Sequence, residues 1–114
     1  MKLIFKIVSA IDWSTAQASG VFGGAAVDRA DGYIHFSTAA QAPETAQKWF
    51  PGRDDLVLVA IDADALGAQL RWEPSRGGAL FPHLYGELPL AAVVWSRPLP
   101  LAEDRRHRFG SLLQ

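Results

Sequence analysis

The segment Leu56–Ile61 is an unbroken run of apolar residues, Leu-Val-Leu-Val-Ala-Ile. Successive side chains of a strand point to opposite faces, so a strand made from this run is apolar on both faces. Such a strand belongs in the middle of a sheet that is covered on both sides. A chain of 114 residues is long enough for one domain with one core. We therefore predict that residues 1–114 form a single layered domain around this strand.

Weaker alternating patterns predict further strands, and capping residues predict two helices. The first helix is predicted over 13–18, with Asp12 as its N-cap. The second runs through 41–50 after a cap at Ser37 or Thr38. The predicted strands are 2–9, 33–36, 56–61, 70–73 and 91–95. This irregular order of strands and helices predicts an α+β domain with a mixed or antiparallel sheet and two or three short helices.

Three segments carry no regular pattern. Residues 20–31 are rich in Gly and Ala and predict a loop that could include a short helix. Residues 80–89 mix aromatic residues with turn residues, and we interpret them as a shaped loop. Residues 100–114 follow two prolines and predict an extended or frayed C-terminal tail.

Composition excludes several classes of function. The formal net charge is -1, which argues against sequence-independent binding to nucleic acid. There are no cysteines, so disulfides, thiolate catalysis and cysteine-based zinc sites are excluded. The apolar run at the N-terminus is interrupted by Lys6 and is too short for a signal sequence or a membrane span. We expect a soluble, cytoplasmic protein of bacterial type that has no membrane partner.

The first candidate site is the stretch Asp31–Thr38, Asp-Gly-Tyr-Ile-His-Phe-Ser-Thr. In a strand, Tyr33 and His35 share one face, while the neighbouring Ile34 and Phe36 point to the other. If the aliphatic and phenyl side chains enter the core, the tyrosine and histidine face either a second packed layer or a cleft. A histidine in a strand is more often structural than functional. However, an aromatic ring, an imidazole and the hydroxyls of Ser37 and Thr38 together can hold a sugar or a planar ring.

The second candidate group lies around the strand at 70–73. Arg71 and Glu73 share a face opposite Trp72, and they form either a surface ion pair or part of a cleft with Glu73 as an acid, a base or a charge stabiliser. The segment Phe81–Gly86 either packs down as a plug or lines a pocket. This group also contributes His83, Tyr85 and Glu87.

Motifs along most of the chain resemble the bacterial "domain of unknown function 952" family. They are Gly-Tyr-Ile-His-Phe-Ser-Thr at 32–38, Leu-Arg-Trp-Glu at 70–73 and Phe-Pro-His-Leu-Tyr-Gly at 81–86. The fold of this family is similar to that of the ADP-ribosyltransferases, which implies a split mixed sheet around an NAD-binding cleft. The resemblance implies that His35 orients a ribose, that Tyr33 or Tyr85 supplies a ring face, and that Glu73 or Glu87 acts at the anomeric centre.

Three hypotheses about function follow. In the first, the histidine-containing cleft binds a nucleotide or an NAD-like cofactor, with chemistry of the ADP-ribosyltransferase type. In the second, the domain keeps the fold as a non-enzymatic binding or accessory module. In the third, it is a metal-dependent enzyme that uses His35 and His83, although the sequence has no close pair of ligands. The geometric expectation is that His35 faces His83 or Tyr85 across one cleft.

Overall fold

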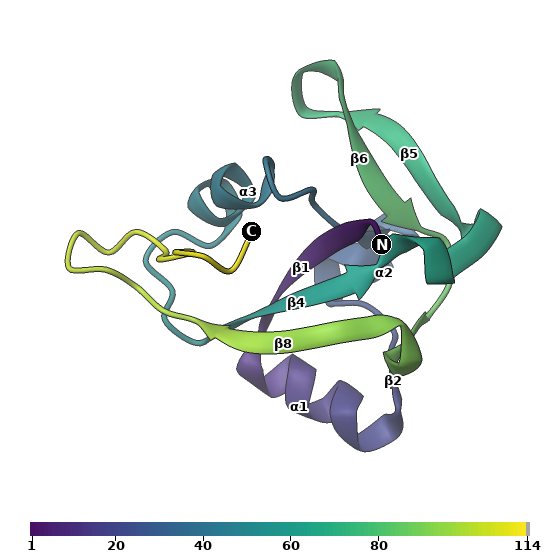
Figure 1. The fold of residues 1–114 in the computed structure, drawn as a ribbon, viewed down its shortest axis with the longest axis horizontal. Coiled ribbons are helices and arrows are strands. Elements are labelled where there is room, and N and C mark those ends of the chain that lie inside the picture. The colour runs from purple at the N-terminus through teal and green to yellow at the C-terminus, as the bar shows by residue number, and fades with distance from the viewer. Residues whose placement is uncertain (114) are drawn as a thin grey trace.

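The main sheet of the computed structural model has three antiparallel strands. The structure describes residues 1–113, apart from the side chain of Arg76. Strand β4 (Leu56–Asp62) lies between β1 (Leu3–Ser9) and β8 (Val93–Leu99), as Figure 1 shows. Both faces of β4 are buried, and Leu58 through Ile61 have no exposed surface. The apolar run therefore forms the central strand, as predicted.

Two smaller antiparallel sheets complete the strands. In one, β6 (Ala79–Leu84) lies between β3 (Ile34–His35) and β5 (Leu70–Ser75). The other pairs β2 (Val21–Phe22) with β7 (Leu88–Pro89). An antiparallel bridge between Phe5 and Ser37 joins β1 to the segment that follows β3. The fold is thus α+β with antiparallel sheets.

Within residues 1–113, three α-helices and three short 3-10 helices connect these strands: α1 (Ala10–Ser19), α2 (Ala26–Asp31), α3 (Ala42–Trp49), η1 (Ala63–Gln69), η2 (Arg76–Gly78) and η3 (Leu90–Ala92). The N-cap of α1 is Ser9 rather than the predicted Asp12, because the Ser9 hydroxyl accepts a hydrogen bond from the Asp12 backbone N–H at 3.1 Å. Helix α1 ends at Gly20, which adopts a left-handed conformation with φ of 87° that glycine tolerates without a Cβ clash.

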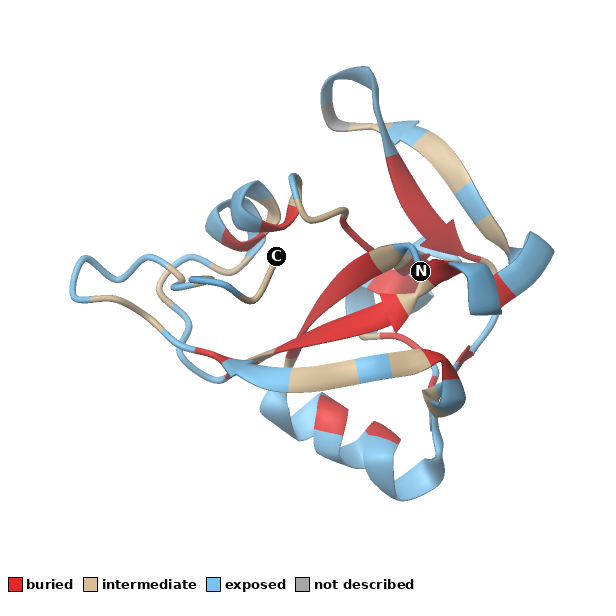
Figure 2. Ribbon diagram, in the orientation of Figure 1, coloured by how far each residue is buried: buried red, intermediate tan, exposed pale blue. Residues whose placement is uncertain are grey.

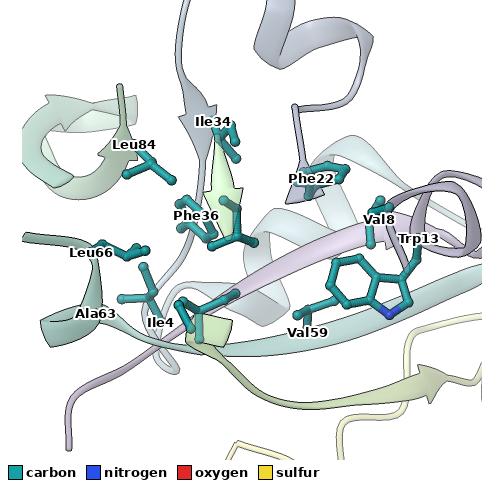
Figure 3. Close-up of a cluster of buried hydrophobic side chains, with 14 residues drawn as sticks. Ile4, Val8, Trp13, Phe22, Ile34, Phe36, Val59, Ala63, Leu66 and Leu84 are labelled. Carbon is teal, nitrogen blue, oxygen red and sulfur yellow. The ribbon is translucent and has the colours of Figure 1, made fainter. Parts of the chain in front are cut away.

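The core has two parts, on either side of the main sheet, and Figure 2 shows the buried strands between them. One cluster packs under α1 and includes Ile4, Trp13, Ile34 and Phe36, and Figure 3 shows these side chains. The other includes Phe5, Leu56, Leu58 and Leu99. Ile34 and Phe36 are thus buried, as the strand pattern predicted.

The structure corrects the interpretation of 80–89 as a loop, because Ala79–Leu84 is the central strand of its sheet. Strands β5 and β8 also extend past their predicted ends, through Pro74 and Pro98. Both strands lie at sheet edges, where the missing N–H of proline leaves no neighbour unpaired.

Residues 100–113 form no helix or strand, but they pack against the domain rather than fray. Phe109, Leu112 and Leu113 pack against the second core cluster. Within the segment, the Arg108 backbone N–H donates to the Pro100 carbonyl at 2.7 Å. Among the helices of residues 1–113, none is long and apolar enough to cross a membrane.

Candidate functional site

A pocket of about 400 Å³ lies beside the free edge of β1, and we call it the site pocket. Side chains from β1, α2, β3, α3, β5 and β6 line it. Five residues of the first candidate stretch take part: Asp31, Tyr33, His35, Phe36 and Ser37. His83 from the second candidate group also lines the pocket. The fold therefore brings the two histidine-containing segments to one cavity.

The two histidines lie side by side on one wall of the site pocket. His35 and His83 are partners in the β3–β6 register, and their ring centroids are 5.5 Å apart. Directly paired residues of neighbouring strands point to the same face. The two rings therefore lie on the same wall, whereas we had expected His35 to face His83 across a cleft. The ring of Tyr33 contacts both, with centroids 4.7 Å from His35 and 4.2 Å from His83. It also lies 5.2 Å from Tyr85.

Two carboxylates hold the His35 ring. Its Nδ1 lies 2.7 Å from Asp28 Oδ1, and its Nε2 lies 2.9 Å from Asp31 Oδ2. Carboxylates only accept hydrogen bonds, so the Nδ1–H group of His35 donates to Asp28, while the contact with Asp31 is an ion pair when the ring is protonated. About a third of the side chain, 32%, remains exposed. The ring is therefore fixed in orientation and still open to the pocket.

Asp28 is the buried centre of this network, and the sequence analysis missed it. Its side chain is 1% exposed, and both carboxylate oxygens lie 3.0 Å from Lys6 Nζ. Burial by itself would raise the pKa of Asp28, but the hydrogen bond from His35 and the charge of Lys6 outweigh it and hold the pKa well below its usual range. Burial lowers the pKa of Lys6, while Asp28 opposes that shift. The network ties β1, α2 and β3 together.

One signal could have revealed Asp28. Lys6 shares a strand face with Ile4 and Val8, both of which are buried. A lysine on a buried face requires a counter-charge. Gly24 makes room for that partner, because a Cβ at this position would lie 2.9 Å from the Cβ of Asp28.

Glu73 accepts two hydrogen bonds at the edge of the same aromatic group. The Tyr85 hydroxyl donates to Oε1 at 2.7 Å, and His83 Nδ1 lies 2.9 Å from the same oxygen. These hydrogen bonds, first from Tyr85 and then from His83, lower the pKa of Glu73. The hydrogen bond to Glu73 in turn raises the pKa of Tyr85. Arg71 does not pair with this carboxylate in a surface ion pair; its guanidinium lies over the Tyr85 ring, 4.9 Å from the centroid.

The other candidate residues lie apart from this cluster. Glu87 lines a separate pocket of about 370 Å³ with Val21 and Gln69, so Glu73 is the glutamate that accompanies the histidines. The Thr38 hydroxyl accepts from the Gln41 backbone N–H at 3.3 Å before α3 begins.

Trp49 lines the site pocket, which we did not predict. Its side chain lies on helix α3 and is 61% exposed. Val27 lines the pocket as well and is 56% exposed. Ser37 is buried, and its hydroxyl lies 2.9 Å from that of Thr45.

The residues described by the structure include no group of three or more His, Cys, Asp or Glu side chains placed to hold a metal ion. Both ring nitrogens of His35 contact carboxylates of α2, while His83 contacts Glu73. The two histidines therefore have separate acidic partners.

Comparison with known proteins gives a family and solved relatives. The profile of the family described as "Protein of unknown function (DUF952)" matches residues 7–96. The crystal structure of protein CC0527 from Caulobacter crescentus is 50% identical, covers 97% of each chain and superimposes with a TM-score of 0.93. The solution structure of the same protein is 50% identical over 99% of this chain and 97% of the other, with a TM-score of 0.88. No curated protein matches the chain.

Proposed function

The chain belongs to the DUF952 family of proteins of unknown function, and we propose that it binds a small ring-containing ligand of the nucleotide or NAD-like class in the site pocket. The observation that carries this proposal is the convergence of Tyr33, His35 and His83 on one wall of that pocket. An aromatic face beside a fixed imidazole is suited to a planar ring attached to a sugar. His35 Nε2 lies 2.9 Å from the exposed Asp31, and we assign a ribose hydroxyl to this His35–Asp31 pair.

The size and lining of the pocket support such a ligand. A volume of about 400 Å³ lies at the small end of the range for ligand sites, which suits one ring with its sugar. Trp49 adds an exposed indole to the lining. Exposing a tryptophan is unfavourable unless a partner covers it, so its position supports a stacking role.

The charges of the pocket indicate which part of the ligand enters it. Of the described residues that line it, only Lys6 carries a permanent positive charge, and Asp28 already pairs with that charge. Asp31 adds a negative charge at the same wall. Phosphate groups bind where free cations or helix N-termini meet them. We therefore propose that the ring and the sugar enter the pocket and that any phosphates remain outside.

Calorimetry tests this proposal with NAD, ADP-ribose, adenosine and nicotinamide riboside as ligands. We expect saturable binding of at least one of them to the wild type. His35→Ala and Trp49→Ala should each weaken it by about tenfold. His107→Ala is the matched control, because His107 lies outside the pocket and contacts the Arg53 carbonyl. An absence of heat with all four ligands, in protein shown to be folded by circular dichroism, contradicts the proposal.

A second candidate function is transfer chemistry of the ADP-ribosyltransferase type, with Glu73 as the acidic residue. It is favoured by the hydrogen bonds from His83 and Tyr85, which keep Glu73 ionised beside the aromatic wall. An ionised glutamate can stabilise the cationic sugar centre that forms when the bond to a leaving group breaks. This second candidate also rests on the similarity of the family's fold to that of the ADP-ribosyltransferases, which the resemblance implies.

Release of nicotinamide from NAD, followed by chromatography, separates this chemistry from binding alone. We expect turnover by the wild type and a loss of at least about a hundredfold in Glu73→Gln. Glu87→Gln is the matched control, since Glu87 lines the other pocket. If NAD binds and no nicotinamide is released, the protein is a non-enzymatic binding module of the kind described by our second hypothesis.

A further inference from the structure

Strand β1 has one free edge, and the register shows which residues face it. Ala63 N–H donates to the Lys2 carbonyl at 2.8 Å, and Ala10 N–H donates to the Asp55 carbonyl at 2.8 Å. Lys2 and Ala10, which flank β1, are both even-numbered, and the register with β4 is unbroken between them. The backbone groups of even residues therefore point to β4, while those of odd residues point away from it.

Phe5 confirms this alternation. Its N–H donates to the Ser37 carbonyl at 2.7 Å, and the Ser37 N–H donates to the Phe5 carbonyl at 2.8 Å. This pair is an isolated bridge, because His35, two positions before Ser37, donates its backbone N–H to Asp28 Oδ1 at 3.0 Å instead of to β1. The next outward-facing residue along β1 is Ile7.

Both backbone groups of Ile7 point away from β4, toward the edge of β1 beside which the site pocket lies. It lines that pocket and is only 6% exposed. Within residues 1–113, no hydrogen-bond partner lies on the outward side of its N–H and C=O. Buried backbone groups are almost always paired, and an unpaired one costs free energy comparable to a lost hydrogen bond. A donor and an acceptor from one extended residue thus stand next to each other in the wall of a cavity.

We propose that Ile7 is a recognition site for a neutral amide edge, such as a lactam or a carboxamide, carried by the ring that enters the pocket. The ligand N–H donates to the Ile7 carbonyl, and the ligand carbonyl accepts from the Ile7 N–H. Ser37 makes the same reciprocal pair of bonds with Phe5 two residues earlier, so the ligand continues the pattern of the strand edge. This inference rests on the proposed function and specifies the chemistry of its ligand.

The charge of the pocket supports a neutral edge. Lys6, adjacent to Ile7, is paired with Asp28, so it leaves no free positive charge for a carboxylate on the ligand. Asp31 would repel such an anion. A ligand that lacks an N–H or a carbonyl at this edge leaves a buried backbone group unpaired, which weakens its binding.

A matched pair of ligands tests the inference. Quinolin-2-one has a lactam N–H beside its carbonyl, and 1-methylquinolin-2-one differs only in that the N–H is methylated. We expect the wild type to bind the first about tenfold more tightly than the second, as measured by calorimetry or by quenching of tryptophan fluorescence. Equal affinities mean that water satisfies Ile7 in both complexes, and they overturn the inference. A failure of both to bind overturns it as well.

Two variants of Ile7 locate the effect. Ile7→Pro removes the outward N–H, which proline can do in an edge strand, and should abolish the preference for the lactam. Ile7→Val keeps the N–H and should retain the tenfold preference. If Ile7→Pro does not fold, the comparison of the two ligands on the wild type still tests the inference. The proposed function is tested by different ligands. It is contradicted only if none of the four ligands of the nucleotide series described above binds.

Discussion

At the scale of single residues, the buried carboxylate of Asp28 is the centre of the polar network beside the site pocket. Its carboxylate accepts from the Ala25 backbone N–H at 2.8 Å and from the His35 backbone N–H at 3.0 Å, and it pairs with Lys6 and with the His35 ring. A buried carboxylate is stable only when hydrogen-bond donors and a counter-charge contact its oxygens in this way. The same contacts orient His35 toward the site pocket, so the stability of the protein and the geometry of its candidate site depend on one side chain.

We predict that Asp28→Asn lowers the free energy of unfolding by about 3 to 5 kcal/mol, because it leaves the Lys6 ammonium buried without a counter-charge. Urea-induced unfolding followed by tryptophan fluorescence measures the change. Asp54→Asn, which alters the same charge at an exposed position, should stay within about 0.5 kcal/mol of the wild type. A loss in Asp28→Asn no larger than in the control contradicts the central role of Asp28.

The lowered pKa of Asp28 also predicts a dependence on pH. The unfolded chain takes up a proton near the ordinary value of 3.8, while the folded carboxylate resists protonation until lower pH. The stabilisation is therefore complete above about pH 5 and is lost as the pH falls through about 4 and below. We expect the difference in stability between wild type and Asp28→Asn to shrink over this window, as measured by urea unfolding at several pH values. A difference that does not change with pH contradicts this prediction.

At the scale of elements, Gln41 connects the start of α3 to strand β6. Its side-chain carbonyl accepts from the Thr38 backbone N–H at 3.0 Å, and its amide donates to the Leu80 carbonyl at 2.8 Å. Helix α3 and strand β6 both line the site pocket. Gln41 therefore holds together two walls of the pocket that lie far apart in the sequence.

We predict that Gln41→Ala destabilises the protein by about 1 to 2 kcal/mol, since two backbone groups lose their partners. Hydrogen exchange at the Thr38 amide should also become faster than in the wild type, by a larger factor than exchange at the amides of β4. Gln47→Ala on the exposed side of α3 is the matched control and should change neither quantity measurably. Unchanged exchange at Thr38 in Gln41→Ala would show that the bond does not order this corner.

At the scale of the whole molecule, the C-terminal segment completes the second core cluster. Leu112 and Leu113 are half-buried against it. The segment is also tied to the turn after α3, because Arg105 Nη2 donates to the Gly52 carbonyl at 2.8 Å. One face of the main sheet thus owes part of its cover to residues that our sequence analysis treated as a tail.

We predict that the double variant Leu112→Ala, Leu113→Ala lowers the free energy of unfolding by about 2 kcal/mol, about 1 kcal/mol for each half-buried side chain. Thermal unfolding measured by calorimetry checks this, with the exposed Ser111→Ala as the control. A midpoint equal to that of the control would mean that the segment does not contribute to the core.

Local patterns in the sequence were enough to predict part of this protein. The run Leu56–Ile61 required a central strand because both of its faces are apolar, and the alternation around His35 separated Ile34 and Phe36 from the histidine because side chains in a strand alternate. Both rules act between neighbours in the chain. The sequence therefore sufficed for the centre of the sheet and for which residues around His35 enter the core.

The tertiary structure alone decided the rest, because those features depend on pairs of residues far apart in the chain. The pairing of β3 with β6 set His35 beside His83, and it made a strand of a segment with no clear alternation. The contact of Lys6 with Asp28 joins residues 22 positions apart, and no local pattern encodes it. The free edge of β1 at Ile7 exists because His35, which the antiparallel bridge places opposite Ile7, donates its N–H to the distant Asp28 side chain instead.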